Sequence, residues 1–444
     1  MSTTAAESPQ VTWALRFVLL DEHGEELAAG EGQASLTVDS LSLLPKLQPP
    51  FSIPLRDVAD VSASDYTLAL ALLSGETLKL SHLGYQYEDL TRQLCRLRNE
   101  LLLTDMLAHE SLRRSGVGAD LVFTDAEGHE VLRGRCEVRL YDTAIVLIPE
   151  RGDIIRLTYS DIARVEDANY VLRIASEYGE EAVLSKLGRE YDSLVRSLSE
   201  AMNALALKVQ AIIRELLPTA GPAVLRRASQ LLKEGRAARR ADIEALSPEL
   251  WEQLVGHLDL AGVREEYDFL TSLGQADRIS IGIKRGLMGD LTGEYVWFLV
   301  PIYSEDPTRP GNAIVMEAAS GEGEGRATYV FRMLSRGAYA RGQGIAELDA
   351  AADRALASIN RCMQAVNFRR EPIYLPERRL AEPQYAHYRY ALNKLPALQE
   401  LRRLFIGRVT HSAPAQWQND ITDLLRFNVG VDDDQAVWRR KGSA

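Results

Sequence analysis

The 444-residue sequence predicts an α+β protein with five parts: two copies of a sheet-and-helix unit, a helical connector, a third sheet-and-helix domain and a helical C-terminal extension. Two observations lead to this prediction. Residues 57–101 recur at residues 161–205 without a gap. In both copies, the spacing of apolar residues changes from a period of two to a period of 3.6, which is typical of strands followed by a helix.

The duplication rests on identical residues in one register. The identical pairs include Asp57/Asp161, Ala59/Ala163, Val61/Val165, Tyr66/Tyr170, Leu68/Leu172, Gly75/Gly179, Tyr87/Tyr191, Leu90/Leu194, Leu94/Leu198, Asn99/Asn203 and Leu101/Leu205. The register also extends upstream, where Asp21 and Gly24 match Asp125 and Gly128. A long self-match at a constant offset indicates a duplicated structural unit.

The first unit covers residues 11–112. About seven short strand patterns precede Gly84, and a turn at residues 21–24 separates the first two. Beyond Gly84, large apolar residues fall on one face of a long helix; they are Tyr87, Leu90, Leu94, Leu97 and Leu101. Burying each of these side chains contributes roughly 1.5–3 kcal/mol. We therefore expect this stripe to bind the helix to the sheet.

The second unit covers residues 118–217 and repeats this plan after a short polar connector at residues 113–116. Its helix stripe comprises Tyr191, Leu194, Leu198, Ala201 and Leu205, and it continues through Val209, Ile212 and Leu216. Two prolines, Pro218 and Pro222, mark the end of the helix.

The order of elements in each unit resembles that of pleckstrin-homology (PH)-like barrels. The run Ile53–Val61 followed by Tyr66-Thr67-Leu68 is similar to the middle of such domains, including the bacterial PH and GRAM types. The resemblance covers residues 11–217, about half of the chain, and carries no catalytic signature. It implies two tandem PH-like barrels, each with about seven strands and one long C-terminal helix. PH-like folds commonly recognise peptides, proteins or lipid head groups, so the resemblance implies a binding protein.

Three further segments follow the repeats. Residues 222–275 predict a connector that is helical throughout, with Ser247 as an N-cap before Pro248. Residues 277–370 predict a third α+β domain with four strands and the helix Ala346–Asn367, and the sequence leaves open whether it is PH-like. Residues 371–444 predict a helical extension and a frayed tail.

Composition limits the compartment and the class of partner. The net charge of −12 disfavours non-specific binding to nucleic acid or to an anionic membrane. Only three cysteines occur, without a CxxC pair, which indicates a reduced cytosol. No secretory signal is visible at the start, and Tyr295–Tyr303 is too short to span a bilayer and contains Pro301. We expect a cytoplasmic protein with no transmembrane segment.

The sequence contains no recognisable catalytic motif. Its seven histidines form no HExxH pattern, and no phosphate-binding GxxxxGK[ST] loop or GxSxG elbow is present. We therefore expect no enzyme activity, no catalytic residue, no metal site and no cofactor.

Two clusters of basic residues are candidate contact surfaces. The first lies in the connector and comprises Arg226, Arg227, Lys233, Arg236, Arg239 and Arg240; it is either a solvated helix face or a docking surface. The second surrounds the third sheet and is the candidate site for an anion or an acidic peptide, with ordinary surface arginines as the alternative. It comprises Lys284, Arg285, Arg326, Arg332, Arg336 and Arg341.

The predicted function is that of a non-enzymatic intracellular scaffold or adaptor that binds a protein partner. One alternative is a membrane-surface adaptor that reads an anionic lipid, and another is an enzyme with its site in the C-terminal half. The first turns of the repeats, residues 21–26 and 125–130, each carry at least three carboxylates and no Lys or Arg. Because phosphorylated head groups would meet like charge there, a protein partner ranks above a lipid. The partner's identity and the oligomeric state are left open.

Overall fold

The computed structural model describes residues 11–107, 110–285, 294–320 and 327–430. Its contacts divide the chain into two compact units. The first unit is Met1–Ala201 with Glu377–Lys394, and the second is Met202–Pro376 with Leu395–Ala444. The segment 377–394, which the sequence predicts to belong to a C-terminal extension, is therefore part of the unit that contains the two barrels.

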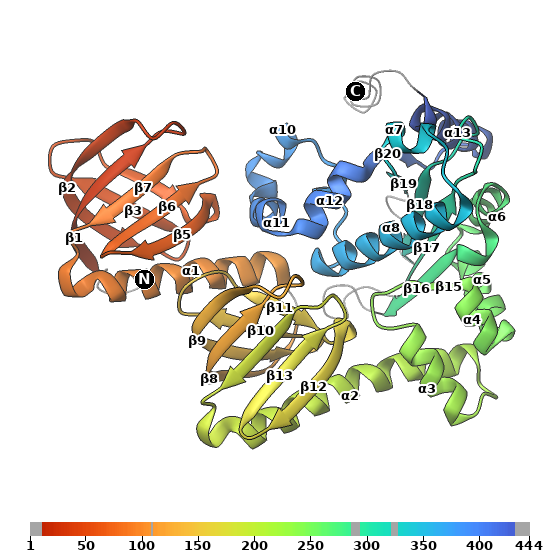
Figure 1. Cartoon of the computed structure of the whole chain (residues 1–444), viewed down its shortest axis with the longest axis horizontal. Helices are drawn as coiled ribbons and strands as arrows, with labels where there is room; N and C mark the ends of the chain where they lie inside the picture. The colour runs from red at the N-terminus through yellow and green to blue at the C-terminus, as the bar shows by residue number, and fades with distance from the viewer. Residues whose placement is uncertain (1–10, 108–109, 286–293, 321–326, 431–444) are drawn as a thin grey trace, which may run out of the picture. The chain divides into compact units, whose positions relative to one another are not determined.

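The first repeat is a curled seven-stranded antiparallel sheet with a helix packed against it (Figure 1). Its strands are β1 (Thr12–Leu20), β2 (Glu26–Leu36), β3 (Ser40–Pro45), β4 (Phe51–Pro54), β5 (Val58–Ser64), β6 (Thr67–Leu72) and β7 (Thr77–Ser81), and its helix is α1 (Tyr87–Leu107). The strand order is β4-β3-β2-β1-β7-β6-β5. Leu90 and Leu94 of α1 share one apolar core with strand residues such as Phe17 and Leu70.

The second repeat has the same topology, in the order β11-β10-β9-β8-β14-β13-β12. Its strands are β8 (Leu112–Thr124), β9 (Glu130–Tyr141), β10 (Ala144–Pro149), β11 (Ile155–Thr158), β12 (Ile162–Ala168), β13 (Val171–Ser176) and β14 (Glu181–Ser185), followed by α2 (Tyr191–Leu216). Strand β8 starts at Leu112, so residues 113–116 are part of a strand rather than a connector. The ladder to β9 and the ion pair between Arg114 and Glu190 extend the strand through this polar stretch.

Local details confirm that the repeats fold alike. Tyr87 and Tyr191 are both buried, and each donates its hydroxyl to a carbonyl oxygen in the sheet, that of Thr67 at 3.4 Å and that of Val171 at 3.3 Å. The turns before these two acceptors have positive φ at both central residues in each copy; the residues are Asp65, Tyr66, Asn169 and Tyr170. Two consecutive residues with positive φ are typical of tight type I′ hairpins.

The second unit contains a six-stranded antiparallel sheet in the simple order β15-β16-β17-β18-β19-β20, which differs from the order in the repeats. The strands are β15 (Ala238–Arg239), β16 (Ser280–Arg285), β17 (Glu294–Ile302), β18 (Ala313–Ser320), β19 (Ala327–Arg332) and β20 (Phe405–Thr410). The four central strands correspond to the four predicted ones. Strands β15 and β20 were not predicted, because both are short edge strands inside sequence that otherwise reads as helical.

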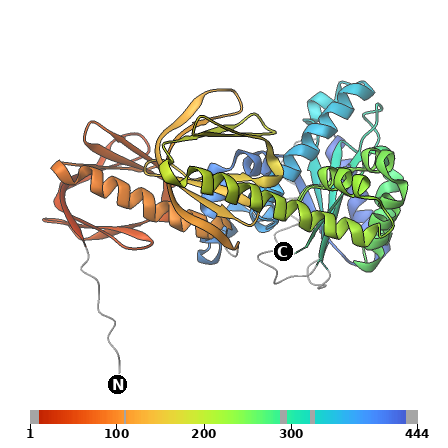
Figure 2. The ribbon, with the colours of Figure 1, turned by 90° about the horizontal axis from the view of Figure 1, so that it is seen from below.

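Helices cover both sides of this sheet (Figure 2). One face shares a core with the second half of α2, α3 (Pro222–Leu231), α4 (Arg240–Leu246), α5 (Pro248–Leu260), α6 (Arg264–Leu273) and α13 (Pro414–Val429). The other helices of this unit are α7 (Arg336–Ala340), α8 (Ile345–Ala365), α9 (Glu371–Tyr374) and α12 (Pro396–Leu404), whereas α10 (Glu377–Leu380) and α11 (Arg389–Lys394) belong to the first unit. Ser247 caps α5 as predicted, because its side chain accepts a hydrogen bond from the amide of Leu250 at 3.3 Å.

Candidate interaction site

The second half of α1 is covered by the second repeat. Its buried residues there include Cys95, Arg98, Asn99, Leu102 and Leu103. All six residues of β10 are buried, whereas burial alternates along β3, the matching strand of the first repeat. A strand is buried on both faces only when something covers the side that points away from its own core. The contacts between α1 and β10 identify α1 as that cover.

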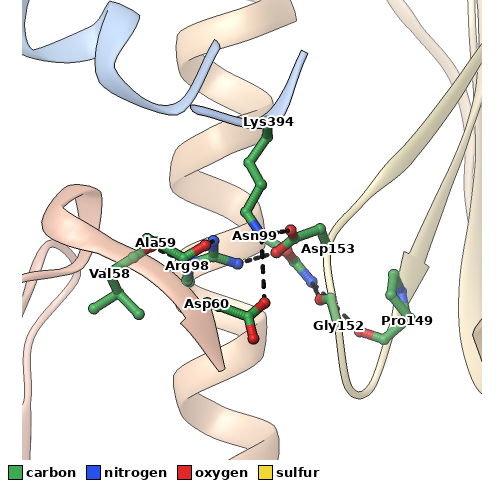
Figure 3. A network of polar contacts seen from close by, with 9 residues as sticks. All are labelled: Val58, Ala59, Asp60, Arg98, Asn99, Pro149, Gly152, Asp153 and Lys394. Atoms are coloured by element: carbon green, nitrogen blue, oxygen red, sulfur yellow. Dashed lines mark hydrogen bonds and ion pairs between the residues drawn. The ribbon is translucent and has the colours of Figure 1, made fainter. Parts of the chain in front are cut away.

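Arg98 is the centre of a polar network at this junction (Figure 3). Its side chain is 2% exposed and forms an ion pair with Asp153 of the second repeat. The guanidinium also donates hydrogen bonds to the carbonyl oxygens of Val58 at 3.1 Å and Ala59 at 3.2 Å. A buried charge is tolerated only when it is paired and hydrogen-bonded. Arg98 therefore ties the start of β5 to the loop between β10 and β11.

The segment 377–394 adds a second cation to the network. The Nζ atom of Lys394 lies 3.0 Å from Oδ2 of Asp153 and 3.3 Å from Oδ1 of Asp60 (Figure 3). Arg389, at the start of α11, forms an ion pair with Asp57. The segment thus contacts acidic groups of both repeats and acts as a clasp on their junction. We call residues 377–394 the clasp.

Asn99 fixes the loop of residues 150–154, which we call the Asp153 loop. Its amide donates to the carbonyl oxygens of Gly152 at 3.0 Å and Pro149 at 3.4 Å. Gly152 has a φ of +96°, and a Cβ there would lie 2.9 Å from Cδ1 of Leu132. The loop therefore needs glycine at this position. The charged groups of this network pair with one another. The network therefore holds segments of the protein together.

The matching loop of the first repeat, residues 46–50, is exposed; we call it the Leu47 loop. Leu47 is 97% exposed, and Leu44, Pro49 and Pro50 are exposed beside it in the chain. The loop is nevertheless ordered locally. The amide of Lys46 donates to the carbonyl of Glu31 at 2.9 Å, as the amide of Glu150 does to that of Arg135 in the second repeat. The exposed apolar residues follow one another closely in this loop, which makes it the candidate docking element of the first repeat.

The basic residues predicted as an anion site serve several separate roles. Lys284 is buried, with its Nζ 5.0 Å from the ring centroid of Phe368. Arg332 donates to Oδ1 of Asn428 at 2.7 Å, and Arg336 donates to the carbonyl of Phe427 at 2.5 Å and stacks on its ring. The structure thus brings Arg332 and Arg336 together at the C-terminal end of α13, where their guanidinium groups contact the protein itself.

The remaining members of that cluster add no common surface. Arg341 is exposed, whereas the side chain of Arg285 and the whole of Arg326 lie outside the described residues. The anion site stays a prediction. No local pattern in the sequence indicates that residues 427–428 contact Arg332 and Arg336.

The basic run of the connector is not a single helix face. Arg226 and Arg227 are exposed on α3, whereas Arg239 belongs to β15 and Arg240 to α4. Arg240 forms an ion pair with Glu244, and Arg239 with Asp353. The predicted fully helical connector is therefore wrong at β15. Tertiary pairing of Ala238 and Arg239 with β16 overrides the helical pattern there.

The second unit contains a cluster of titratable groups, one buried and two partly buried, that was not predicted from the sequence. His411, which follows β20, lies between two carboxylates: its Nδ1 is 3.3 Å from Oε1 of Glu266, and its Nε2 is 3.1 Å from Oε1 of Glu317. Glu317 is fully buried and accepts a hydrogen bond from Thr328 at 2.5 Å. Burial raises the pKa of Glu266. Isolated acidic and histidine residues far apart in sequence gave no signal for this cluster.

The described residues contain no group of three or more His, Cys, Asp or Glu side chains placed to hold a metal ion. The three thiols, those of Cys95, Cys136 and Cys362, are all buried. Burial raises the pKa of Cys136 and of Cys362 to about 12, which keeps them protonated at neutral pH. Among the described helices, none combines the length and apolar character needed to cross a bilayer.

Comparisons with known proteins add little to this description. No protein-family model matches the sequence, and no curated protein matches it. One matching solved structure is described as "Structure of the Spt16D Pob3N heterodimer"; it is 10% identical, the match covers 37% of this chain and 83% of that chain, and the TM-score is 0.15. A score this low supports no argument. The two repeats share one strand order, and each ends in a long helix, which is the order of elements that the PH-like resemblance implies.

Proposed function

We propose that the chain is a non-enzymatic scaffold that binds a protein partner through its tandem PH-like repeats. The observation that carries the proposal is the contrast between the two loops. The Asp153 loop docks on a helix inside the chain, and the Leu47 loop occupies the same place in the first repeat with its apolar side chains exposed. Because the Asp153 loop contacts protein at this position of the second repeat, the Leu47 loop at the same position of the first repeat is suited to contact a protein partner.

The energetics of the Leu47 loop favour a protein surface. Burying one large apolar side chain contributes roughly 1.5–3 kcal/mol. The loop is held in place before binding, because Gln48 donates to the carbonyl of Ala29 at 3.0 Å and Lys46 pairs with Glu31 at 2.6 Å. A preorganised loop loses little conformational entropy when a partner binds.

The first turns of the repeats argue against a phosphorylated lipid head group. In each turn an aspartate side chain accepts two backbone amides: Asp21 from His23 and Glu25, and Asp125 from Glu127 and His129. These turns are acidic and already internally hydrogen-bonded. A lipid phosphate there would meet negative charge at both repeats.

Site-specific photo-crosslinking in the native cells tests the proposal. A photoreactive amino acid in place of Leu47 should give adducts with protein, whereas the same group in place of Tyr85, which is 94% exposed, should not. Absence of any protein adduct at Leu47 would contradict the proposal. Saturable sedimentation of the chain with anionic liposomes at low salt, lost in a Leu47→Asp variant, would favour the membrane alternative.

A second candidate function, acid–base catalysis in the second unit, is favoured by the Glu266–His411–Glu317 cluster. A histidine held between two carboxylates can store and transfer a proton. Deletion of the protein from its native cells defines a growth defect, and the wild-type chain should reverse it. A His411→Ala variant that keeps the Leu47 adducts but does not reverse this defect would support the alternative. Loss of the adducts in the same variant would instead indicate a structural role.

A further inference from the structure

We infer that the Leu47 loop binds α2 of a second copy of this chain, in a head-to-tail contact that repeats the junction between the two repeats. This inference rests on the proposed function and names its partner. The two helices and the two loops share some features and differ in others, and both kinds support a second copy as the partner.

The first feature is the asparagine that holds the docked loop. Asn99 is fully buried on α1 and donates to the carbonyl oxygens of Gly152 and Pro149. The identical residue in the repeat register is Asn203 on α2, and it is exposed. The loop residue that corresponds to Pro149 is Pro45, which precedes the Leu47 loop. The second helix therefore carries the same donor at the same position, and the first repeat carries the matching acceptor.

The second feature is the apolar face beside that asparagine. Leu102 and Leu103 of α1 are buried, whereas their counterparts Ala206 and Leu207 are exposed, Leu207 by 63%. On α2 the docking face is thus present and open. The exposed Leu207 can pack against Leu47 of a second copy, and the exposed Asn203 amide can donate to a backbone carbonyl of the same loop.

The third feature is that both charged residues of the junction are absent from the proposed contact. At the junction within the chain, Arg98 pairs with Asp153. In the repeat register, Met202 replaces Arg98 on the helix and Pro49 replaces Asp153 on the loop. Both members of the ion pair are replaced by apolar residues, so the contact between copies buries no unpaired charge at this position.

The tip of the loop also changes from a charged to an apolar residue. Arg151, which pairs with Glu88 at 2.5 Å in the junction within the chain, is replaced by Leu47. The counterpart of Glu88 is Asp192, which is exposed.

The strand beside the loop sets the strength of the contact. On β10, the outward residues Ala144 and Val146 are apolar and fully buried. Their counterparts on β3 are Ser40 and Ser42. The contact between copies therefore buries less apolar area than the junction within the chain, and we expect association that depends on concentration.

The geometry also determines the symmetry. Each copy offers one loop and one helix face, so the contact joins two different surfaces and is heterologous. Such a contact leaves a free loop at one end of a dimer and a free helix face at the other. Two complementary variants can therefore distinguish it from a symmetric dimer.

The test is sedimentation velocity of the full chain at concentrations up to about 0.2 mM, where contacts of micromolar strength are populated. Leu47→Asp disables the loop, Asn203→Arg disables the helix face, and Tyr85→Asp is a matched exposed control. We expect the wild type and the control to gain mass with concentration and each disabling variant to stay monomeric. A mixture of the two disabling variants should form a one-to-one dimer that grows no further.

Three results would overturn the inference: a monomeric wild type, an Asn203→Arg variant that still associates, or a mixture that stays monomeric. Circular dichroism and thermal unfolding of both variants must match the wild type, as expected for substitutions at exposed sites. If the wild type is monomeric while Leu47 crosslinks to a different protein, the second-copy inference fails and the protein-binding function stands. If Leu47 crosslinks to no protein at all, both fail.

Discussion

The two long helices, α1 and α2, begin in the same way and end differently. Leu94 and Leu198 lie at the same position in the repeat register and are both buried in their barrels. Further along, α1 carries Arg98 and Asp105 where α2 carries Met202 and Val209. Arg98 reaches the second repeat, Asp105 pairs with Arg56, and Val209 joins the core of the second unit.

The difference shows which positions of a duplicated unit are constrained. Residues that face the barrel core are kept, because a change there leaves a cavity or a clash in either copy. Residues that point outward are free to diverge, and they determine what each helix binds. In this chain, the polar end of α1 receives another repeat and the clasp, and the apolar end of α2 belongs to a different core.

The largest expected loss of stability comes from placing a residue of α2 at the matching position of α1. Arg98→Met places the residue of the second repeat into the first, and we expect it to destabilise the first unit by about 3–5 kcal/mol, because Asp153 loses its buried partner. Chemical denaturation of the full chain measures the loss. Arg164→Met, which removes an exposed ion pair with Glu166, is the control and should cost less than about 1 kcal/mol. A loss below about 1 kcal/mol for Arg98→Met would show that the junction is not held by this pair.

The double variant Arg98→Met with Asp153→Asn sharpens this prediction. Removing the second charge should recover part of the loss, because a neutral amide is less costly to bury unpaired than a carboxylate. The interaction energy from the double-mutant cycle should exceed about 0.5 kcal/mol. Simple additivity would mean that the two side chains act independently.

The shared cores give the next largest effect. Leu94→Ala and Leu198→Ala should each destabilise the chain by about 2–5 kcal/mol, as large-to-small changes in a packed core do. The two losses should be similar, because the two positions are equally buried. Denaturation of the full chain followed by tryptophan fluorescence and circular dichroism measures both. Leu260→Ala, at an exposed site of α5, is the control and should change stability by less than about 0.5 kcal/mol.

Most of the fold of the repeats could be predicted from the sequence, because it is encoded by local patterns. Alternation and the later 3.6-residue stripe placed strands and helices, and the repeat register placed Tyr87 and Tyr191 at equivalent sites. The register could not show which outward residues are buried. Arg98 looks like a solvated helix residue until Asp153 is known to cover it.

The clasp and the cluster of Glu266, His411 and Glu317 could not be predicted, and the reason is the same for both. Asp57 and Asp161 are identical in the repeats, yet Arg389, more than three hundred residues away from Asp57, contacts only one of them. His411, Glu266 and Glu317 come from three separate parts of the chain. Strand β20 lies between two stretches predicted to be helical, and it pairs with β19. Contacts between distant segments leave no periodic signal in a single sequence.

Low pH should destabilise the second repeat through a partly buried ion pair that the first repeat lacks. Burial raises the pKa of Glu110, but its pairing with Arg156 outweighs this effect, so the pKa is lowered overall. The counterpart of Arg156 in the first repeat is Ser52, whose hydroxyl lies 3.2 Å from that of Ser42. A carboxyl with a lowered pKa stabilises the fold above its unfolded-state pKa of about 4.3, and this stabilisation is lost as the pH falls through the folded-state pKa.

We therefore expect Glu110→Gln to destabilise the chain by about 1–3 kcal/mol at pH 7 and by progressively less below about pH 4.3. Stability measured by denaturation across this range tests the prediction. Glu130→Gln, which removes an exposed partner of Arg133, should leave the pH profile of stability nearly unchanged. A loss for Glu110→Gln that is the same at pH 7 and at pH 3 would contradict the assignment.

The smallest expected change in stability tests whether the clasp joins the repeats or merely lies on them. Lys394 bridges Asp60 of the first repeat and Asp153 of the second, and its side chain is partly exposed. Lys394→Met should cost less than about 1 kcal/mol of global stability, because solvent screens a partly exposed bridge.

The same variant should have a larger effect on the local opening of the clasp, since the clasp makes few other charged contacts with the second repeat among the described residues. Hydrogen exchange of residues 377–394 should accelerate in this variant, and in the wild type at high salt, which screens the same bridge. Lys79→Met, at an exposed site of β7, should leave that exchange unchanged. If exchange in the clasp is the same in Lys394→Met as in the wild type, then Arg389 and Asp57 hold the clasp, and its bond is to the first repeat alone.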